Sequence, residues 1–313
     1  MQRMLTRRTL VGMAAASLAS SALASGNLVA QAVAGSGQAT DQTTGQAGTQ
    51  FSVMIWTLNK LGTFEENLER VAQAGYHHVE LVGEFKKWSE DDYRRILARM
   101  QTLKVSVDAT SGVGPGFADP SGGDAFLSAL KSLIPAAQRL QCKQIILLSG
   151  KRIEGAPAGS QHAASIEALK RAADVLSSAG LVAVIEPIDR LENPTIYLDG
   201  VTEAFEIAKA VGSPNVKVLY DFYHEQRGSG NLIEKLEKNV DWVGLVHIAD
   251  VPGRHEPGTG EIDYGNIYRS LGKLHYSGFI AMEYSPTIDP VASLKKSRME
   301  AQQAIAESQQ VGR

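Results

Sequence analysis

Three acidic residues and one histidine stand at the ends of four short, β-branched runs in the second half of the chain. They close the runs Val184-Ile185-Glu186, Leu219-Tyr220-Asp221, Val246-His247 and Met282-Glu283. Each residue alone is as readily explained as a helix cap or a solvated group. Three carboxylates in one partly buried site would repel one another unless a cation, added protons or an arginine such as Arg254 compensated them. Together the four residues predict a divalent metal site, provided that the fold gathers their strand ends.

A cation held by carboxylates and one imidazole suits proton transfer next to a carbonyl group. This donor set favours Mn²⁺, Mg²⁺ or Co²⁺ and also admits Zn²⁺. Such an ion would stabilise the enediolate that forms when a proton leaves the neighbouring carbon. Glu186 and Glu283 are the candidate acid/base residues, because a carboxylate that binds a metal through one oxygen keeps the other free. The residues predict metal-assisted proton transfer, without assigning which glutamate acts first.

The elements that would position these groups alternate regularly from Phe51 onward. Runs rich in β-branched residues predict eight strands, over 51–56, 78–82, 105–109, 144–149, 181–186, 216–221, 242–247 and 279–283. Amphipathic segments predict helices that include 64–74, 90–103, 125–140, 163–179, 201–211 and 232–239. We interpret residues 51–313 as a single (β/α)8 TIM barrel, in which the carboxyl ends of the strands form one rim. A doubly wound open sheet is the alternative, but no glycine-rich dinucleotide motif follows the first strand.

The first 50 residues differ in composition from the rest of the chain. Arg3, Arg7 and Arg8 precede an apolar run from Leu10 to Ala24, a pattern typical of a signal peptide, and Thr6-Arg7-Arg8-Thr9-Leu10 resembles a twin-arginine signal. We expect residues 1–24 to be a twin-arginine-type signal peptide and 25–50 a disordered linker, so that the protein is periplasmic or secreted. A plain basic signal sequence is the alternative. The apolar run is short and interrupted by serines, which disfavours a permanent membrane span.

The composition excludes several classes of function. The chain has 313 residues, of which 43% are hydrophobic and 21% are charged, with a formal net charge of -3. These values predict a large core and disfavour nucleic-acid binding, including that of a metal-dependent nuclease on a related barrel. The single cysteine, Cys142, excludes an intramolecular disulfide and a cysteine-based zinc site. The expected partner is a small hydroxy-carbonyl or sugar substrate; a homo-oligomer is compatible with the sequence but is not indicated by it.

An eighteen-residue stretch after the seventh predicted strand resembles the hydroxypyruvate isomerases. It runs from His247 to Tyr264 and reads HIADVPGRHEPGTGEIDY. The segments Ile185-Glu186-Pro187-Ile188, Asp221-Phe222-Tyr223-His224-Glu225-Gln226 and Met282-Glu283-Tyr284-Ser285-Pro286 agree with the same family. These enzymes are xylose-isomerase-like TIM barrels, a group that also includes the ketose 3-epimerases. The resemblance covers about residues 51–300. It implies aldose–ketose isomerisation at a metal held by Glu186, Asp221, His247 and Glu283, with the two glutamates acting as acid/base residues.

The resemblance also implies residues that bind the substrate. His224 corresponds to a substrate-contacting histidine, with a packed rim histidine as the alternative. Arg254 corresponds to an anion or hydroxyl contact, and its planar fork suits a substrate carboxylate, with a surface arginine as the alternative. We add His255 and Glu256, which adjoin Arg254 and could orient it or gate the site. We also add Glu80, which ends the second strand and could reach the mouth as a carboxylate behind the metal ligands, with a rim ion pair as the alternative. The predicted substrate-binding set is His224, Arg254, His255, Glu256 and Glu80.

The reaction predicted first is the conversion of hydroxypyruvate to tartronate semialdehyde. Two features depart from the family. Hydroxypyruvate isomerases are typically cytoplasmic and often have Gln in place of His247, and the loop from Glu186 to Tyr197 differs from the usual family sequence. An exported ketose 3-epimerase or a keto-sugar lyase or isomerase is therefore the alternative. A sugar-binding protein whose metal only shapes the pocket is the second alternative.

Overall fold

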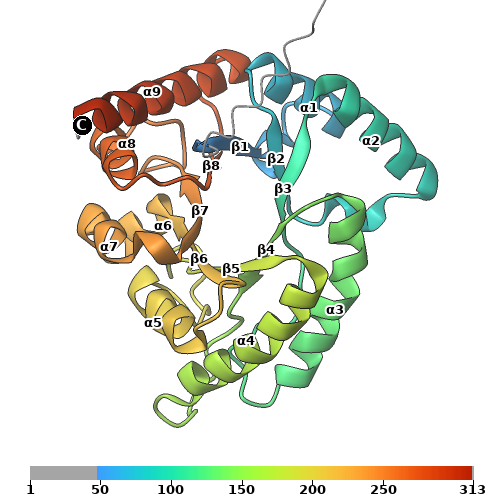
Figure 1. Cartoon of the computed structure of the whole chain (residues 1–313), viewed down its shortest axis with the longest axis vertical. Helices are drawn as coiled ribbons and strands as arrows, with labels where there is room; N and C mark the ends of the chain where they lie inside the picture. The colour runs from blue at the N-terminus through green and yellow to red at the C-terminus, as the bar shows by residue number, and fades with distance from the viewer. Residues whose placement is uncertain (1–47, 312–313) are drawn as a thin grey trace, which may run out of the picture. The chain divides into compact units, whose positions relative to one another are not determined.

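The computed structural model describes residues 48–311, which form a closed parallel barrel with helices around it (Figure 1). Each strand pairs with the next one along the chain, and β8 pairs with β1. The strands are β1 (Gln50–Met54), β2 (His78–Leu81), β3 (Ser106–Thr110), β4 (Gln144–Leu148), β5 (Val182–Glu186), β6 (Val216–Asp221), β7 (Val243–Ile248) and β8 (Phe279–Met282). The predicted (β/α)8 barrel is confirmed.

The predicted signal peptide over 1–24 and most of the predicted linker lie outside the described residues. The end of the linker needs a correction, because Gln50 already belongs to β1. Its amide donates a hydrogen bond to Gly278 O at 3.2 Å, and the Thr49 hydroxyl donates one to Tyr276 O at 2.6 Å. Backbone pairing with β8 therefore orders these polar residues, although their composition resembles that of a linker.

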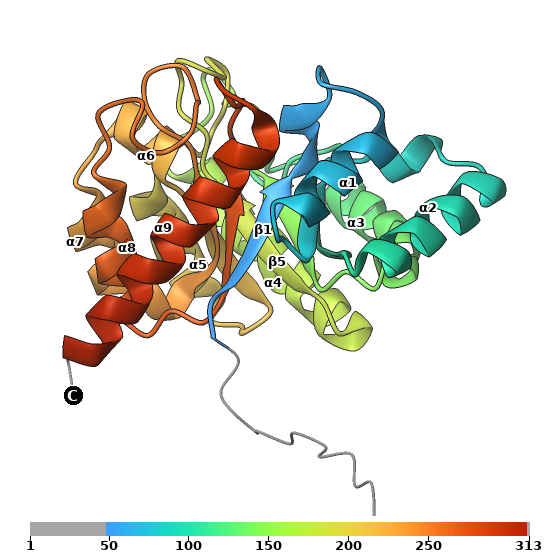
Figure 2. The same cartoon turned by 90° about the horizontal axis from the view of Figure 1, so that it is seen from above.

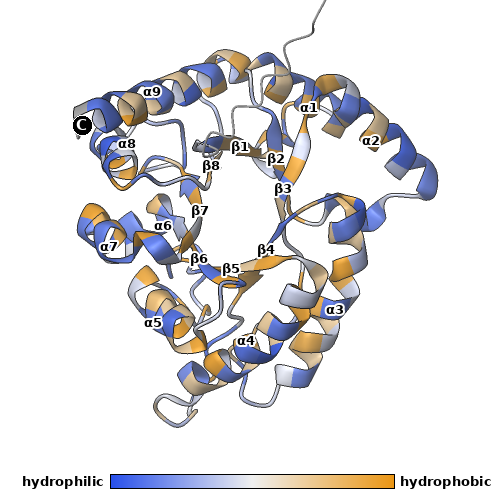
Figure 3. Ribbon diagram, viewed as in Figure 1, coloured by the Kyte–Doolittle hydropathy of each residue, from blue (hydrophilic) through white to orange (hydrophobic). Residues whose placement is uncertain are grey.

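Helices follow the strands and cover the outside of the barrel, with their apolar faces turned inward (Figure 3). All six predicted helices are present, with ends within three residues of those predicted. Helices α6, α8 and α9 were not among those predicted. The helices are α1 (Phe64–Gln73), α2 (Glu90–Leu103), α3 (Gly123–Arg139), α4 (Ser160–Ala179), α5 (Val201–Val211), α6 (Phe222–Gly228), α7 (Leu232–Asn239), α8 (Tyr264–Lys273) and α9 (Pro290–Val311), with short 3-10 helices at Ile55–Leu58, Glu84–Lys87 and Val240–Trp242. No helix within residues 48–311 combines the length and the apolar character needed to cross a membrane.

The inside of the barrel holds an inner apolar cluster to which every strand except β2 contributes one buried residue. Its members are Met54, Ala109, Ile146, Val184, Leu219, Leu245 and Ala281. Side chains two residues apart on a strand point to the same face. The residues two positions beyond four of these members therefore point into the barrel as well, closer to the carboxyl ends of the strands. They are Glu186, Asp221, His247 and Glu283.

A β-bulge at Gly244 sets the register between β6 and β7. Val218 pairs with Val243, whereas Leu219 pairs with Leu245, so Gly244 is left as an extra residue. A Cβ on Gly244 would lie 2.8 Å from Val184 Cγ1 and 2.7 Å from Lys217 Cβ, which explains why glycine occupies this position. The shift by one residue places His247 directly opposite Asp221. The bulge thus aligns two of the candidate metal ligands.

A second bulge, between β2 and β3, turns Asp108 into the barrel. Val79 pairs with Val107 and Glu80 pairs with Ala109, so Asp108 has no partner in the register. Its buried carboxylate accepts a hydrogen bond of 2.6 Å from Ser52 Oγ, on β1. Burial, and then the charge of Glu80, raise the pKa of the Asp108 carboxyl well above its usual value. Asp108 is therefore harder to ionise in the folded protein than in the unfolded chain.

Replacing Asp108 with asparagine is expected to stabilise the protein at pH 7.5. An acid whose pKa rises on folding binds a proton as the chain folds, and this becomes less favourable as the pH increases above the pKa of the unfolded chain. The amide in Asp108→Asn can still accept the bond from Ser52 and needs no proton. Thermal unfolding should give a higher Tm for the variant at pH 7.5, by roughly 2 to 4 °C for each kcal/mol gained. The difference should shrink toward pH 3.5. An equal or lower Tm at pH 7.5 would show that Asp108 is ionised in the fold.

Candidate active site

The four residues at the ends of β5 to β8 meet in one buried cluster on the rim of the barrel. The strands run in one direction, so the connections that follow them lie along the same edge, the upper one in Figure 2. Glu186, Asp221, His247 and Glu283 each offer a ligand atom, and these atoms lie within 4.8 Å of one another. All four side chains are buried, the most accessible being Glu186 at 8%. The strand ends therefore meet as the sequence predicted.

The donor atoms of this cluster fit a divalent cation. Asp221 Oδ2 is buried and has no hydrogen-bond partner, while Asp221 Oδ1 accepts bonds from the amides of Tyr223 and His224 at 2.7 and 3.3 Å and so caps α6. The nearest basic atoms to Oδ2 are His224 Nε2 at 3.4 Å and Arg254 Nη2 at 3.6 Å, so a cation bound directly to this buried oxygen would compensate it further. His247 Nδ1 lies 4.0 Å from Glu186 Oε1 and 2.7 Å from Glu283 Oε2. The four side chains thus supply three carboxylates and one imidazole nitrogen around one centre.

Arg254 lies over the same cluster. Its Nη2 atom is 2.7 Å from Glu283 Oε2 and 3.6 Å from Asp221 Oδ2, and its Nη1 atom is 2.7 Å from Glu192 Oε1. Its guanidinium also stands over the rings of Trp56 and Tyr223. Arg254 adopts a left-handed backbone conformation, with φ of 57°, that aims its side chain at the mouth of the barrel. An arginine was one predicted means of reducing the repulsion between the carboxylates, and Arg254 makes such a contact with Glu283.

His224 is held against the cluster by an aspartate that the sequence analysis did not identify. Its Nδ1 atom lies 2.7 Å from Asp189 Oδ2, and its Nε2 atom lies 3.4 Å from Asp221 Oδ2 and 4.0 Å from Glu186 Oε1. Burial opposes a charge on this ring, but Asp221 and Asp189 outweigh it and raise the pKa of His224 to about 9. Asp189 follows Glu186 by three residues in a loop that departs from the family sequence, so no motif pointed to it. The ring of His224 is thereby oriented with Nε2 toward the cluster.

The environments of the two glutamates shift their pKa values in opposite directions. Burial, and then the charge of Glu283, raise the pKa of Glu186 to about 7. Burial acts in the same direction on Glu283, but Arg254 and His247 outweigh it and lower the pKa of that carboxyl. Pairs of carboxylates whose environments drive their pKa values apart are typical of acid/base sites.

Glu80 needs a correction, because it does not face the mouth. Its side chain is fully buried, and its Oε2 atom lies 2.9 Å from His247 Nε2. A side chain with no access to solvent behind His247 has no route to a substrate. Glu80 therefore contacts His247 from behind and does not itself line the mouth, where a substrate contact was predicted.

His255 and Glu256 also point away from the cluster. Glu256 is buried and accepts hydrogen bonds from the amide and the hydroxyl of Thr287, at 3.0 and 2.7 Å. His255 Nδ1 lies 2.8 Å from Ser285 O. Both side chains fasten the loop after β7 to the segment that connects β8 with α9. Their predicted contact with substrate is replaced by a structural role next to Arg254.

Asp250 organises the loop that carries Arg254, and the sequence analysis did not single it out. Its fully buried carboxylate accepts hydrogen bonds of 2.9, 2.9, 2.8 and 3.1 Å from four backbone amides, those of Val251, Gly258, Gly260 and Ile262. A Cβ on Gly260 would lie 1.9 Å from Val251 O, so this turn admits only glycine. The motif after β7 is thus a folding motif as well as a source of site residues.

Replacing Asp250 with alanine is expected to disorder this loop. Four backbone amides would lose their acceptor, so the free energy of unfolding should fall by at least about 2 kcal/mol. The KM should rise by roughly tenfold or more, because Arg254 would lose its fixed position. Thermal unfolding and steady-state kinetics would measure both effects. Asp124→Ala, at a side chain that is 91% exposed, is the control. An unchanged Tm and KM in Asp250→Ala would contradict the role given to this loop.

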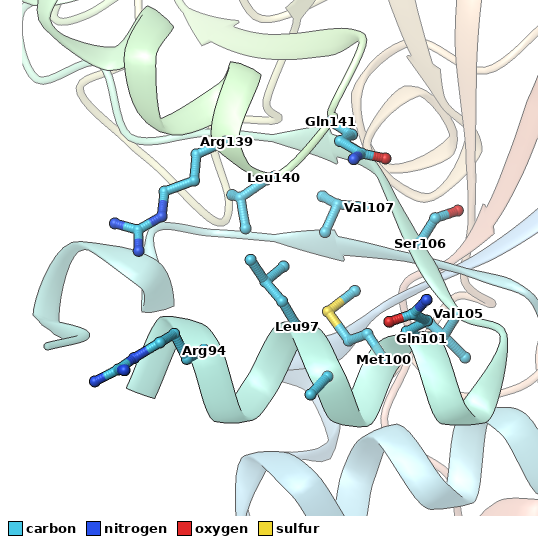
Figure 4. Close-up of a pocket in the computed structure, with 11 residues that line it drawn as sticks. Arg94, Leu97, Met100, Gln101, Val105, Ser106, Val107, Arg139, Leu140 and Gln141 are labelled. Atoms are coloured by element: carbon cyan, nitrogen blue, oxygen red, sulfur yellow. The ribbon is translucent and has the colours of Figure 1, made fainter. Parts of the chain in front are cut away.

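A cavity of about 560 Å³ lies away from the cluster, between α2, the start of β3 and the end of α3 (Figure 4). It is lined mainly by apolar side chains such as Leu97, Met100 and Leu140, and Arg94 and Arg139 also line it. None of its lining residues is a carboxylate, a histidine or a cysteine. This cavity therefore offers no acid/base pair, and the candidate site remains the rim cluster.

Comparisons with known proteins relate this chain to one family of barrels. Residues 68–309 match the family model described as the xylose isomerase-like TIM barrel. Hydroxypyruvate isomerase of Escherichia coli K12 is 30% identical over 238 residues, which cover 74% of this chain and 92% of that protein. A 2-oxo-tetronate isomerase of Cupriavidus necator is 31% identical over 201 residues, covering 64% and 70%. The crystal structure of AP endonuclease, family 2, from Brucella melitensis matches with a TM-score of 0.72 at 26% identity, covering 79% of this chain and 96% of that one.

Proposed function

Because the chain belongs to the xylose isomerase-like TIM barrel family and is a hydroxypyruvate isomerase-like enzyme, we propose that it converts hydroxypyruvate to tartronate semialdehyde. The observation that carries this proposal is the geometry of the rim, where two glutamates, a histidine and an arginine surround one buried centre. The reaction moves a proton between adjacent carbons and shifts the carbonyl group, with no net oxidation. It therefore needs groups that exchange protons and a means of stabilising negative charge on the substrate oxygens.

The proposed metal ligands are Glu186, Asp221, His247 and Glu283. The unpartnered Asp221 Oδ2 and the buried excess of carboxylates support a divalent ion at this place. Mn²⁺, Mg²⁺ and Co²⁺ are favoured by the oxygen-rich donor set, and Zn²⁺ is a further candidate. When bound, the ion would act as a Lewis acid that stabilises developing negative charge on the substrate oxygens.

The chain's own residues account for the proton transfers. One of Glu186 and Glu283 takes the proton from the carbon that bears the hydroxyl group, and the proton returns to the adjacent carbon. His224 is oriented by Asp189, so its Nε2–H can donate to a substrate oxygen. Arg254 is the proposed partner of the substrate carboxylate, for which it would exchange part of its present contact with Glu283 and Glu192.

Incubation in deuterated water with a panel of substrates would test this function. The panel contains hydroxypyruvate, 2-oxo-tetronate, free ketoses and a keto-glycoside, and NMR would follow deuterium entry next to the carbonyl. Hydroxypyruvate should exchange and form tartronate semialdehyde. The similarity to a 2-oxo-tetronate isomerase makes that compound the second candidate substrate. Exchange confined to ketoses would indicate a 3-epimerase instead, and no exchange on any compound would indicate a sugar-binding protein.

We further propose that the protein is exported in the folded state. The twin-arginine pattern at Arg7-Arg8 and the apolar run from Leu10 to Ala24 support this location. Expression in a bacterium with and without the twin-arginine pathway, followed by cell fractionation, would test it. The protein should appear in the periplasm or medium only when the pathway is present, and Arg7→Lys with Arg8→Lys should retain it in the cytoplasm.

A further inference from the structure

Glu80 places a carboxylate at the level of the inner apolar cluster, to which each of the other seven strands contributes one apolar side chain. In the strand register it pairs with Met54 of β1 and Ala109 of β3, which are both members of the inner apolar cluster. Its side chain is fully buried. Transfer of a carboxylate from water to such a place is strongly unfavourable unless a specific partner compensates it. An apolar residue would fill this position at no such penalty, so the carboxylate calls for a functional explanation.

The partner of Glu80 is His247, whose two ring nitrogens have different neighbours. The Nε2 atom lies 2.9 Å from Glu80 Oε2. The Nδ1 atom lies 2.7 Å from Glu283 Oε2 and 4.0 Å from Glu186 Oε1, and so faces the cluster. A neutral imidazole carries one proton, which it donates from one nitrogen while the other keeps a lone pair. A proton on Nε2, donated to Glu80, leaves the lone pair of Nδ1 available to a cation.

Asp108 has a buried carboxyl group near Glu80. Unlike that of Glu80, this carboxyl group makes no hydrogen bond to His247. Its Oδ1 atom accepts the bond from Ser52 Oγ, and its Oδ2 atom has no partner. Glu80 Oε1 is likewise buried without a partner. Asp108 therefore shares the burial and the charge environment of Glu80 without its contact to the ring. This makes Asp108→Asn a matched control for a change at Glu80.

We propose that Glu80 is a positioning residue of the metal site: by accepting a hydrogen bond from His247 Nε2, it orients the imidazole and leaves Nδ1 free to bind the ion. The inference rests on the proposed function, because His247 is a ligand only if the cluster holds a metal. Carboxylate partners of metal-binding histidines typically account for a 10- to 100-fold change in metal affinity. The competing explanation is an internal ion pair that only stabilises the fold. Such a pair would affect unfolding but not the affinity of the folded protein for a metal.

Titration of the metal-free full-length chain with Mn²⁺ alone distinguishes these explanations. The free ion is measured by electron paramagnetic resonance for wild type, Glu80→Ala, Glu80→Gln and Asp108→Asn, and circular dichroism verifies the fold. Glu80→Ala should raise the Kd for Mn²⁺ by about 10- to 100-fold. Glu80→Gln should raise it by less than about tenfold, because the amide oxygen still accepts a bond from Nε2. Asp108→Asn should stay within about threefold of wild type.

A second measurement reports on the ring directly. Zn²⁺-loaded wild-type protein with ¹⁵N-labelled histidine should show His247 bound to the ion through Nδ1, with a slowly exchanging proton on Nε2. In Glu80→Gln this proton should remain but exchange faster. If Glu80→Ala does not fold, Glu80→Gln and the wild-type spectrum still decide the question.

Different results would contradict the role of Glu80 and the proposed function. A wild-type Kd for Mn²⁺ in folded Glu80→Ala, or coordination of Zn²⁺ through Nε2, would overturn the role of Glu80 and leave the isomerase proposal intact. Absence of Mn²⁺ and Zn²⁺ binding by wild type would overturn both the role of Glu80 and the metal site. Neither readout depends on finding the substrate.

Discussion

Replacing Glu186 with glutamine is expected to lower kcat by about 10²- to 10⁴-fold, while substrate affinity stays within about tenfold of wild type. Glutamine has nearly the same shape, but its amide neither accepts a proton from carbon nor delivers one. Glu186 Oε1 lies 4.0 Å from both His247 Nδ1 and His224 Nε2, beyond hydrogen-bond distance, so no described contact of that oxygen competes with proton transfer. The measurement is the rate of deuterium incorporation from solvent into hydroxypyruvate, at saturating Mn²⁺ and with the metal content determined for each sample.

Glu261→Gln is the matched control for this variant. Glu261 lies on the same side of the barrel, is exposed, and accepts a hydrogen bond of 3.1 Å from Gln226. The same substitution at this position should change kcat by less than about twofold. If Glu186→Gln retained more than a third of the wild-type exchange rate with its metal bound, Glu186 would not carry the proton. Glu283 would then have to act alone.

The meeting of the four rim residues could be predicted because each is a polar residue that follows an apolar one at or next to the end of its strand. Val184 and Glu186 on β5, and Leu219 and Asp221 on β6, lie two residues apart and so share a face. A barrel gathers the carboxyl ends of its strands on one rim, so residue types and order along the chain were sufficient. The prediction needed no knowledge of distances.

The interior partners of this site could not be predicted, because they depend on register shifts. Without the bulge at Gly244, the pairing of Val218 with Val243 would set Asp221 opposite Val246 instead of His247. A glycine within a β-branched run was a signal for this bulge. The run around Asp108 contains no such signal, so nothing in it indicated that this side chain turns into the barrel. The register of Glu80 on β2, beside the bulge at Asp108, depends on the same shift, so its contact with His247 could not be derived from the sequence.

In the loop after β7, the sequence did not indicate which side chains reach the site. Arg254, His255 and Glu256 are consecutive, yet only Arg254 reaches the cluster. The left-handed conformation of Arg254 redirects the chain, and the next two side chains bind the segment after β8. Asp250 imposes this shape by accepting hydrogen bonds from four amides that lie up to eleven residues apart in the sequence. Proximity in sequence to a site residue was therefore a poor guide to contact with the site.

Replacing Asp221 with asparagine is expected to raise the Kd for Mn²⁺ by roughly 100-fold or more, since loss of a direct ligand should exceed the loss of an outer partner. The two carboxylate oxygens of Asp221 have separate tasks. Oδ1 caps α6 through the amides of Tyr223 and His224, and an asparagine oxygen can continue to do so. Oδ2 has no partner, and an NH₂ group in its place would repel a cation. Calorimetric titration of the metal-free variant with Mn²⁺ measures the loss, and activity at limiting Mn²⁺ should fall in proportion.

Because the two carboxylate oxygens of Asp221 have different contacts, Asp221→Asn is a more specific test of metal binding than Asp221→Ala. Asp221→Ala removes the cap as well, which should destabilise the fold by about 0.5 to 2 kcal/mol and confuse loss of metal with loss of structure. Asp263 caps α8 in the same manner, accepting a bond of 3.0 Å from the amide of Asn266, and it is exposed. Asp263→Asn should therefore match Asp221→Asn in thermal unfolding of the metal-free protein to within a few degrees, while keeping wild-type affinity for Mn²⁺. If Asp221→Asn bound Mn²⁺ as tightly as Asp263→Asn, the four rim residues would not be the ligands. The cationic side chains of Arg254 and His224 would then suffice to compensate this carboxylate cluster.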